Sequence, residues 1–221
     1  MEIKKFRNHY GLELINVSHE NIQPGDLVWD RLTSTPVFSH RNMPNTIYNA
    51  FLDASLINEN EFKTIKTECR NIQLIDAAIA DKKVDVNTEL IAEMKHPLIG
   101  NIDGSFKLET IRKFCFGDIK VKIMPDLLRV KIDQFLEQMK KNRWEEYDGR
   151  IRRVNMITEL YYGSVKLVVE RGLAEDFESA LNKTGIEILA RAEGSTSVEY
   201  EFEHDTAPFA MRIERIKTFN G

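Results

Sequence analysis

The residues of this chain that could do acid–base or metal chemistry are few and scattered. Among its 221 residues the sequence has five histidines, and neither an HExxH motif nor two histidines four residues apart occurs. Zinc sites in enzymes and small domains need such spacings, because the ligands must converge from one helix or one turn. We therefore predict no metal ligand among the histidines, which are His9, His19, His40, His96 and His204.

Nucleophiles and phosphate loops are equally without a supporting motif. Ser18 precedes His19, and Cys115 stands alone, but neither lies in a G-x-S-x-G turn that would expose a nucleophile. Gly100 and Gly104 bracket Asn-Ile-Asp, without the lysine and the following helix that a phosphate loop needs. We expect no catalytic residue, no cofactor and no enzymatic activity.

Composition narrows the class of protein further. A formal net charge of −4 argues against general nucleic-acid binding, which needs a dominant basic face. Cys69 and Cys115 lack CxxC spacing and predict buried free thiols in a reducing compartment. No apolar run approaches the roughly 18 residues of a membrane-spanning helix, and the first residues lack the apolar segment of a signal peptide. We expect a protein made in soluble form in the cytoplasm.

The N-terminus carries a small basic cluster. Lys4, Lys5 and Arg7 flank the apolar residues Ile3 and Phe6. Each basic residue near an anionic lipid surface contributes about 1 kcal/mol of attraction. The cluster is a candidate for membrane-surface binding, and the alternative interpretation is an ordinary polar terminus.

The first half of the chain predicts short elements separated by loops. Residues 12–17 predict a strand, and Pro24-Gly25-Asp26 predicts a turn. A helix is expected to begin after Asn45 or Thr46 and to run through Ala54. Residues 62–79 begin with the alternation of a strand and continue with the apolar spacing of a helix, so they stay ambiguous.

The second half predicts longer elements. Residues 106–124 predict a strand whose apolar face changes phase at Gly117-Asp118, and an amphipathic helix follows Pro125 and ends in Lys140 and Lys141. Residues 154–170 predict a long strand, residues 173–193 a helix stopped by Gly194, and residues 198–213 a closing β-hairpin. This order predicts one α+β domain over residues 1–221 with a mostly antiparallel sheet.

Three pairs of segments stand out along the chain: YGLELINV and IQPGDLV near the start (residues 10–17 and 22–28), RVNMITEL with VKLVV (153–160 and 165–169), and SVEYEF with PFAMRI near the end (197–202 and 208–213). These segments resemble bacterial gasdermins. The resemblance implies the fold of the gasdermin N-terminal domain, a twisted, mostly antiparallel central sheet with surrounding helices. It also implies that the chain oligomerises on a membrane, refolds two segments into amphipathic β-hairpins and opens a large pore that kills the cell, as in antiviral defence.

The resemblance also implies partners and a location. The partners would be anionic or bacterial-type membrane lipids, further copies of the chain, and an inhibitory or activating protein or a protease, but no nucleic acid. The chain would be cytoplasmic when inactive and at the inner membrane when active. Two features depart from the bacterial members: the first cysteine is Cys69, which leaves no N-terminal acylation site, and only Lys217 to Gly221 follow the last predicted strand. We therefore expect either a processed form or control by a partner protein.

Residues 154–170 are the candidate membrane-inserting strand. A strand crosses a bilayer with about 9 to 11 residues that alternate between lipid and water. The candidate inserting residues are Val154, Met156, Leu160, Val165, Leu167 and Val169. Val165, Leu167 and Val169 form the favoured lipid-facing set, which makes Leu167→Lys the first variant to consider.

Two other classes of function stay open. One is a non-enzymatic binding module that recognises a protein through a sheet edge or an apolar groove. The other is a small hydrolase that would gather His96 or His204 with an acid and with Cys115 or a serine. Lipid binding with leakage separates the pore-forming hypothesis from both.

Overall fold

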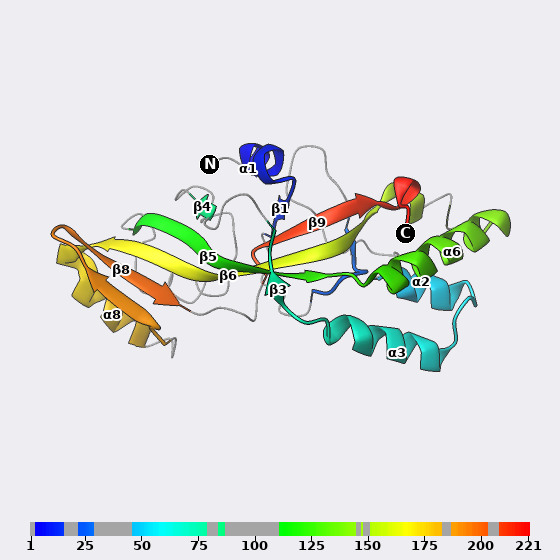
Figure 1. The fold of residues 1–221 in the computed structure, drawn as a ribbon, viewed down its shortest axis with the longest axis horizontal. Coiled ribbons are helices and arrows are strands. Elements are labelled where there is room, and N and C mark those ends of the chain that lie inside the picture. Colours follow the sequence, from blue (N-terminus) through cyan, green and yellow to red (C-terminus); the bar gives the residue numbers. More distant parts are fainter. Residues whose placement is uncertain are drawn as a thin grey trace. The chain divides into compact units, whose positions relative to one another are not determined.

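The fold is described from a computed structural model, for residues 3–15, 22–28, 46–78, 84–86, 111–144, 147, 151–182, 187–202 and 208–221. Helices and strands are mixed, and the described strand pairs are antiparallel, which confirms the predicted α+β class (Figure 1). In chain order the elements are α1 (Ile3–Tyr10), β1 (Glu13–Leu14), β2 (Leu27–Val28), α2 (Ile47–Asp53), α3 (Glu59–Arg70), β3 (Ile75–Asp76), β4 (Val84–Val86), β5 (Ile111–Ile123), α6 (Asp126–Lys141), η2 (Ile151–Arg153), β6 (Asn155–Glu170), η3 (Arg171–Leu173), α8 (Ala174–Asn182), β7 (Ala190–Glu193), β8 (Ser197–Phe202), β9 (Ala210–Arg215) and η4 (Ile216–Thr218).

The chain forms two compact units. The first comprises Met1–Glu20, Asp76–Val121 and Tyr161–Ala210, and the second comprises Asn21–Ile75, Lys122–Leu160 and Met211–Gly221. The strands join in one sheet of order β1-β9-β6-β5-β3, to which β2, β4, β7 and β8 add. A single domain over residues 1–221 stays a prediction, because compactness alone does not tell whether a unit unfolds by itself.

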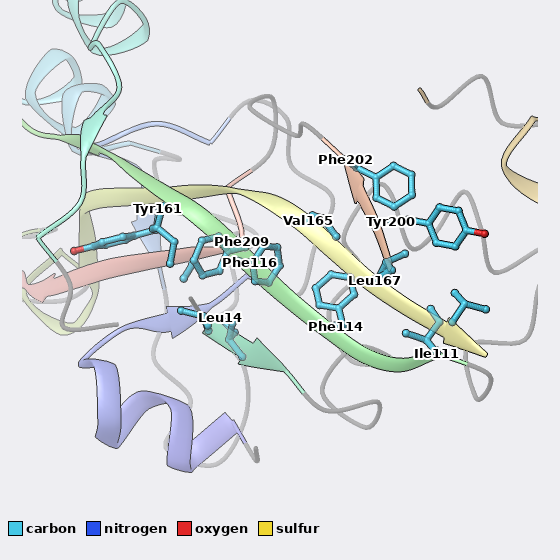
Figure 2. Packing of buried hydrophobic residues seen from close by; sticks show 14 of the residues in the cluster. Leu14, Ile111, Phe114, Phe116, Tyr161, Val165, Leu167, Tyr200, Phe202 and Phe209 are labelled. Atoms are coloured by element: carbon cyan, nitrogen blue, oxygen red, sulfur yellow. The ribbon is translucent and has the colours of Figure 1, made fainter. Parts of the chain in front are cut away.

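The core of the first unit lies between α8 and the β6–β8 pair. Register places Val165 opposite Phe202, Leu167 opposite Tyr200 and Val169 opposite Val198, and all six side chains are buried. Val165, Leu167, Tyr200 and Phe202 belong to one buried cluster with Phe114 of β5, and Figure 2 shows these side chains along β5, β6 and β8. Phe177 of α8 packs on Tyr200 with ring centroids 4.8 Å apart. The opposite face of the pair is partly exposed and carries Lys166, Val168, Glu199 and Glu201.

The predicted phase change in β5 is confirmed. Phe114 and Phe116 are buried at even positions, whereas Ile119 and Val121 are buried at odd positions. Between them Asp118 has a φ of 43°, a left-handed conformation that few L residues adopt and that re-aims the following side chains. Residues 114–117 are all buried, and the bend that follows them restores the alternation of buried and more exposed residues from Ile119 onward.

The core of the second unit packs helices α2, α3 and α6 together. The predicted apolar stripe of α6 is buried through Leu128, Ile132, Leu136 and Met139. Thr46 caps α2 as expected, since its hydroxyl accepts the backbone N–H of Asn49 at 3.1 Å. The predicted stripe of α6 and the predicted cap of α2 are both confirmed, and each depends on a signal within a single helix.

The ambiguous residues 62–79 resolve in the order opposite to the predicted one. Helix α3 comes first, and the short strand β3 follows. The helix is started by a capping box, because the Asn58 side chain accepts the backbone N–H of Glu61 and the Glu61 carboxylate accepts that of Asn58. Phe62, Ile65 and Cys69 then lie on one helical face, and Ile65 and Cys69 are buried.

Replacing Asn58 with alanine is expected to destabilise the fold by about 1 kcal/mol, because the first backbone N–H groups of α3 lose their acceptor. Urea unfolding followed by circular dichroism measures the change. Asn60→Ala is the matched control, since Asn60 is exposed inside α3 and alanine favours helices. A loss of stability in the control as large as in Asn58→Ala would show that the cap is not the cause.

The helix predicted over residues 173–193 is shorter than expected. Helix α8 ends at Asn182, and Ala190–Glu193 form strand β7, which pairs antiparallel with β8. The backbone N–H of Gly194 donates to Ser197 at 2.7 Å and closes the turn between these strands. Gly194 therefore marks a hairpin turn rather than a helix end, and cross-strand hydrogen bonds outweigh the helical spacing upstream of it.

The predicted closing hairpin of residues 198–213 is wrong in its pairing. Strand β8 pairs with residues 165–170 of β6, whereas Phe209 donates to Tyr161 and Ile216 donates to Val154 at backbone distances of 2.9 and 3.1 Å. Strand β8 and the segment from Phe209 to Ile216 therefore both run antiparallel to β6, and they pair with successive parts of it. The alternation correctly predicted that Val198, Tyr200 and Phe202 are buried, but alternation does not identify a pairing partner.

Candidate functional site

The predicted membrane-surface cluster lies on or beside α1. Phe6 is fully buried in the core of the first unit, and this anchors the helix. The Arg7 guanidinium forms an ion pair with the nearly buried carboxylate of Glu13. The side chains of Lys4 and Lys5 lie outside the described residues. Because Glu13 offsets the charge of Arg7, the role of this cluster at a membrane stays a prediction that rests mainly on the two lysines.

The six candidate inserting residues are all buried in the folded chain. Val154 directly precedes β6, and Met156, Leu160, Val165, Leu167 and Val169 lie within it; each is 0% exposed. None of them faces solvent in this conformation. Insertion into lipid would first require the side chains that cover them, such as Phe177 of α8, to move away.

The described residues do not test the alternative hydrolase. His96 and His204 lie outside them, and Cys115 is buried with its Sγ 3.8 Å from the carbonyl oxygen of Lys166. Within the described ranges, no three His, Cys, Asp or Glu side chains gather as metal ligands. No helix in this part of the chain is both long enough and apolar enough to cross a membrane.

A cationic pocket lies in the second unit. It has a volume of about 250 Å³ and is lined by Arg152 and Arg153 of η2, Arg215 at the end of β9 and Lys217 of η4. The backbone that carries these cations is anchored to the core. Ile151, Val154 and Ile216 are buried, and the backbone N–H of Ile216 donates to the carbonyl oxygen of Val154 at 3.1 Å. Four positive charges therefore converge on one small cavity.

Two described acids near this pocket in sequence have other partners. Glu214 precedes Arg215, but both of its carboxylate oxygens accept hydrogen bonds from Arg129, at 3.0 and 2.9 Å. Glu159 in β6 pairs with Arg212 at 2.8 Å. Among the described residues no carboxylate forms an ion pair with Arg153, Arg215 or Lys217. A pocket lined by four cations, three of which have no ion-pair partner among the described residues, is the candidate site of the described chain.

Sequence reasoning missed this pocket for a physical reason. Arg152 and Arg153 stand more than 60 positions before Arg215 and Lys217, and the backbone hydrogen bond from Ile216 to Val154, just before β6, brings the two segments together. A usable signal was present, because each basic pair directly flanks a strand rich in apolar residues. Basic residues at the ends of neighbouring strands can converge on one anion.

A second electrostatic feature of this unit is a buried polar cluster around Asp26. The backbone N–H of Gln23 donates to the Asp26 carboxylate at 3.0 Å, yet burial outweighs this bond and raises the pKa of Asp26 to about 7. Nearby, the Cys69 thiol donates to the Tyr48 hydroxyl at 3.2 Å, and burial raises the pKa of Cys69 to about 11. The raised pKa values make a reactive thiolate unfavourable and make Asp26 the titrating member of the cluster.

The turn beside Asp26 depends on a glycine. Gly25 has a φ of +96°, and a Cβ atom at this position would lie 2.4 Å from the ring of Tyr48. Glycine is therefore required both by the backbone and by the close approach of the buried ring. The predicted turn of Pro24-Gly25-Asp26 thus holds Tyr48 and Asp26 in one cluster.

Comparison with known proteins finds neither a family model nor a curated protein that matches the chain. The likeness to gasdermins therefore stands on the sequence segments quoted above.

Proposed function

We propose that the protein acts on anionic membranes, where it assembles with further copies and opens pores that end the life of the cell. The observation that carries this proposal is the length of β5 and β6, which have 13 and 16 residues and lie next to each other in the sheet. The backbone N–H of Met124, just after β5, donates to Thr158 near the start of β6, and Arg112 near the start of β5 forms an ion pair with Glu170 at the end of β6. The two strands therefore run antiparallel. Each strand exceeds the roughly 9 to 11 residues that cross a bilayer.

The alternation of β6 and β8 supports the same proposal. Val165, Leu167 and Val169 form an apolar row, and Lys166 on the reverse face pairs with Glu201 at 3.0 Å. In a membrane the apolar row would meet lipid and the charged face would meet water, which is the arrangement that a water-filled pore needs. The folded chain hides this row under α8, so the proposal requires α8 to leave the sheet at the membrane.

Dye release from vesicles tests this proposal. We expect the purified chain to release dye from vesicles that contain phosphatidylglycerol, with weaker release from pure phosphatidylcholine, because anionic headgroups attract basic residues. Hydrogen exchange should show that the amides of α8 lose protection when the anionic vesicles are present. Intact vesicles, together with normal growth of bacteria that express the soluble chain, would contradict the proposal.

A protein-binding module is the second candidate, and strand β7 favours it. All four residues of β7 are exposed, and within the described chain β7 pairs with β8 alone. Such an edge can accept a further strand from a partner. The charged side chains of Arg191 and Glu193 reduce unspecific pairing at this edge. A chain that binds a partner but leaves vesicles intact would favour this candidate.

A further inference from the structure

The cationic pocket of η2, β9 and η4 has the chemistry of a receptor for a phosphate group. We propose that Arg152, Arg153, Arg215 and Lys217 bind a small anion that bears a phosphomonoester, supplied either by a lipid headgroup or by a soluble metabolite. This inference goes beyond pore formation, because it concerns binding alone and holds whether or not the chain opens a membrane.

The pocket gathers positive charge without a described carboxylate partner for three of its four cations. Like charges close together repel, and clusters of them are stable when a counter-ion neutralises them. The other arginines of this region have carboxylate partners, namely Glu214 for Arg129 and Glu159 for Arg212. Arg153, Arg215 and Lys217 have none among the described residues, and a bound anion would supply a counter-charge to all three.

The hydrogen-bond donors of the pocket match the oxygens of a phosphate group. A guanidinium presents paired N–H groups that match two oxygens of a phosphate, and a lysine adds a compact charge that can follow the third oxygen. The pocket combines three guanidinium groups with one ammonium group. This set suits a doubly charged, three-oxygen phosphomonoester better than a single carboxylate.

The volume of the pocket and its anchored backbone suit a small ligand. Pockets for drug-sized ligands measure roughly 300 to 1,000 Å³, so a cavity of about 250 Å³ admits a phosphate with a small substituent. The backbone below the pocket is held by buried Ile151, Val154 and Ile216, and Arg129 lies over the Phe219 ring at 5.0 Å. This packing fixes the backbone that carries the four cations, although the side chains of Arg153, Arg215 and Lys217 are themselves exposed, so only the backbone part of the entropy cost of binding is lowered.

Titration calorimetry tests the proposal with three probes: inorganic phosphate, glycerol 3-phosphate, and vesicles of phosphatidylcholine with or without phosphatidic acid. The pocket variant is Arg153→Gln, Arg215→Gln and Lys217→Gln combined. The matched control is Lys131→Gln, Lys140→Gln and Lys141→Gln, which removes the same charge from exposed positions on α6 of the same unit. Circular dichroism confirms that both variants are folded.

We expect the parent and the control to bind glycerol 3-phosphate alike, and the pocket variant to bind with a Kd at least about tenfold higher, because charge-assisted hydrogen bonds are lost. If phosphatidic acid vesicles bind through the pocket and glycerol 3-phosphate competes, the ligand is a lipid headgroup. Binding of the soluble probe without pocket-dependent vesicle binding identifies a soluble ligand. No binding by the parent, or equal weakening in the control, would overturn the proposal.

The same experiment separates this inference from the proposed function. Dye release that persists in the pocket variant, while binding of glycerol 3-phosphate is lost, would support both proposals and place pore formation elsewhere in the chain. Phosphate binding without any dye release would contradict the pore and leave the pocket as inferred.

Discussion

Leu167→Lys is expected to destabilise the folded chain by about 4 kcal/mol or more, because it removes a fully buried apolar side chain and places an ammonium group in the core. Leu167 lies opposite Tyr200 in the β6–β8 register, within the cluster that also contains Phe177 of α8. The expected result is loss of the soluble fold at room temperature. Urea unfolding and near-ultraviolet circular dichroism measure it.

Val168→Lys is the matched control for this prediction. Val168 is the next residue of β6, it is partly exposed on the reverse face, and it lies opposite Glu199. A lysine there gains an oppositely charged cross-strand neighbour, so we expect a change within about 1 kcal/mol. A Leu167→Lys protein as stable as the Val168→Lys protein would contradict the burial of this face in solution.

These two variants also determine how insertion can be tested. Leu167→Lys does not distinguish a failed pore from a failed fold, so loss of leakage in this variant carries no information about insertion. Val168→Lys keeps the fold, and its side chain lies on the face that would meet water in a pore. It should therefore release dye as the parent does.

Raising the pH from 5 to 8 is expected to lower the stability of the parent relative to Asp26→Asn by about 2 kcal/mol. The folded-state pKa of Asp26 is about 7, above its ordinary value of 3.8. Between these two values the unfolded chain releases the proton while the folded chain retains it, so the stability contributed by Asp26 falls as pH rises and the fall ends above the folded pKa. A full shift would amount to about 4 kcal/mol, and partial solvent access at Asp26 reduces it.

The difference between the two proteins isolates Asp26. Other carboxylates act in the opposite direction, since the hydrogen bond from Tyr200 lowers the pKa of Glu178, but they are present in both proteins and cancel. The asparagine oxygen can still accept the backbone N–H of Gln23, which preserves the local hydrogen bond. Parallel stability curves for parent and Asp26→Asn from pH 5 to pH 8 would show that the carboxyl titrates normally.

The sequence predicted those elements whose signals lie within one segment. Pro125 before an apolar stripe predicted α6, Thr46 predicted the start of α2, and the shift from even to odd apolar positions located the bend at Asp118. In each case the signal is a property of one helix or one strand. Long-range packing then agrees with the local preference and does not override it.

The errors arose where pairing decides the structure. Residues 190–193 have no strong strand pattern of their own, and they form β7 because β8 offers backbone partners. Strands β8 and β9 alternate as hairpin strands do, but both pair with β6, whose 16 residues are long enough for two successive partners. No local pattern records which of several amphipathic strands will be a neighbour.

The order of residues shows two basic pairs that flank strands, but it does not show that the two pairs meet in one pocket. Arg152 and Arg153 lie in η2, Arg215 ends β9 and Lys217 lies in η4, and these segments meet at the backbone hydrogen bond from Ile216 to Val154. The N-terminal cluster was easier to see because its three basic residues are close in sequence. Yet Arg7 of that cluster has Glu13 as a partner, which sequence proximity did not reveal.

The two cysteines give the chain a built-in pair of reporters. Neither cysteine forms a disulfide and both are about 1% exposed; Cys69 belongs to the second unit and Cys115 to the first. A thiol-reactive reagent can modify either one only when the surrounding unit opens, so the alkylation rates, assigned by peptide mass spectrometry, measure two opening equilibria in one unmodified sample. Equal rates would reveal one cooperative domain, and unequal rates would rank the two units by their resistance to opening. The same reagent added with vesicles would record which unit opens first at a membrane surface.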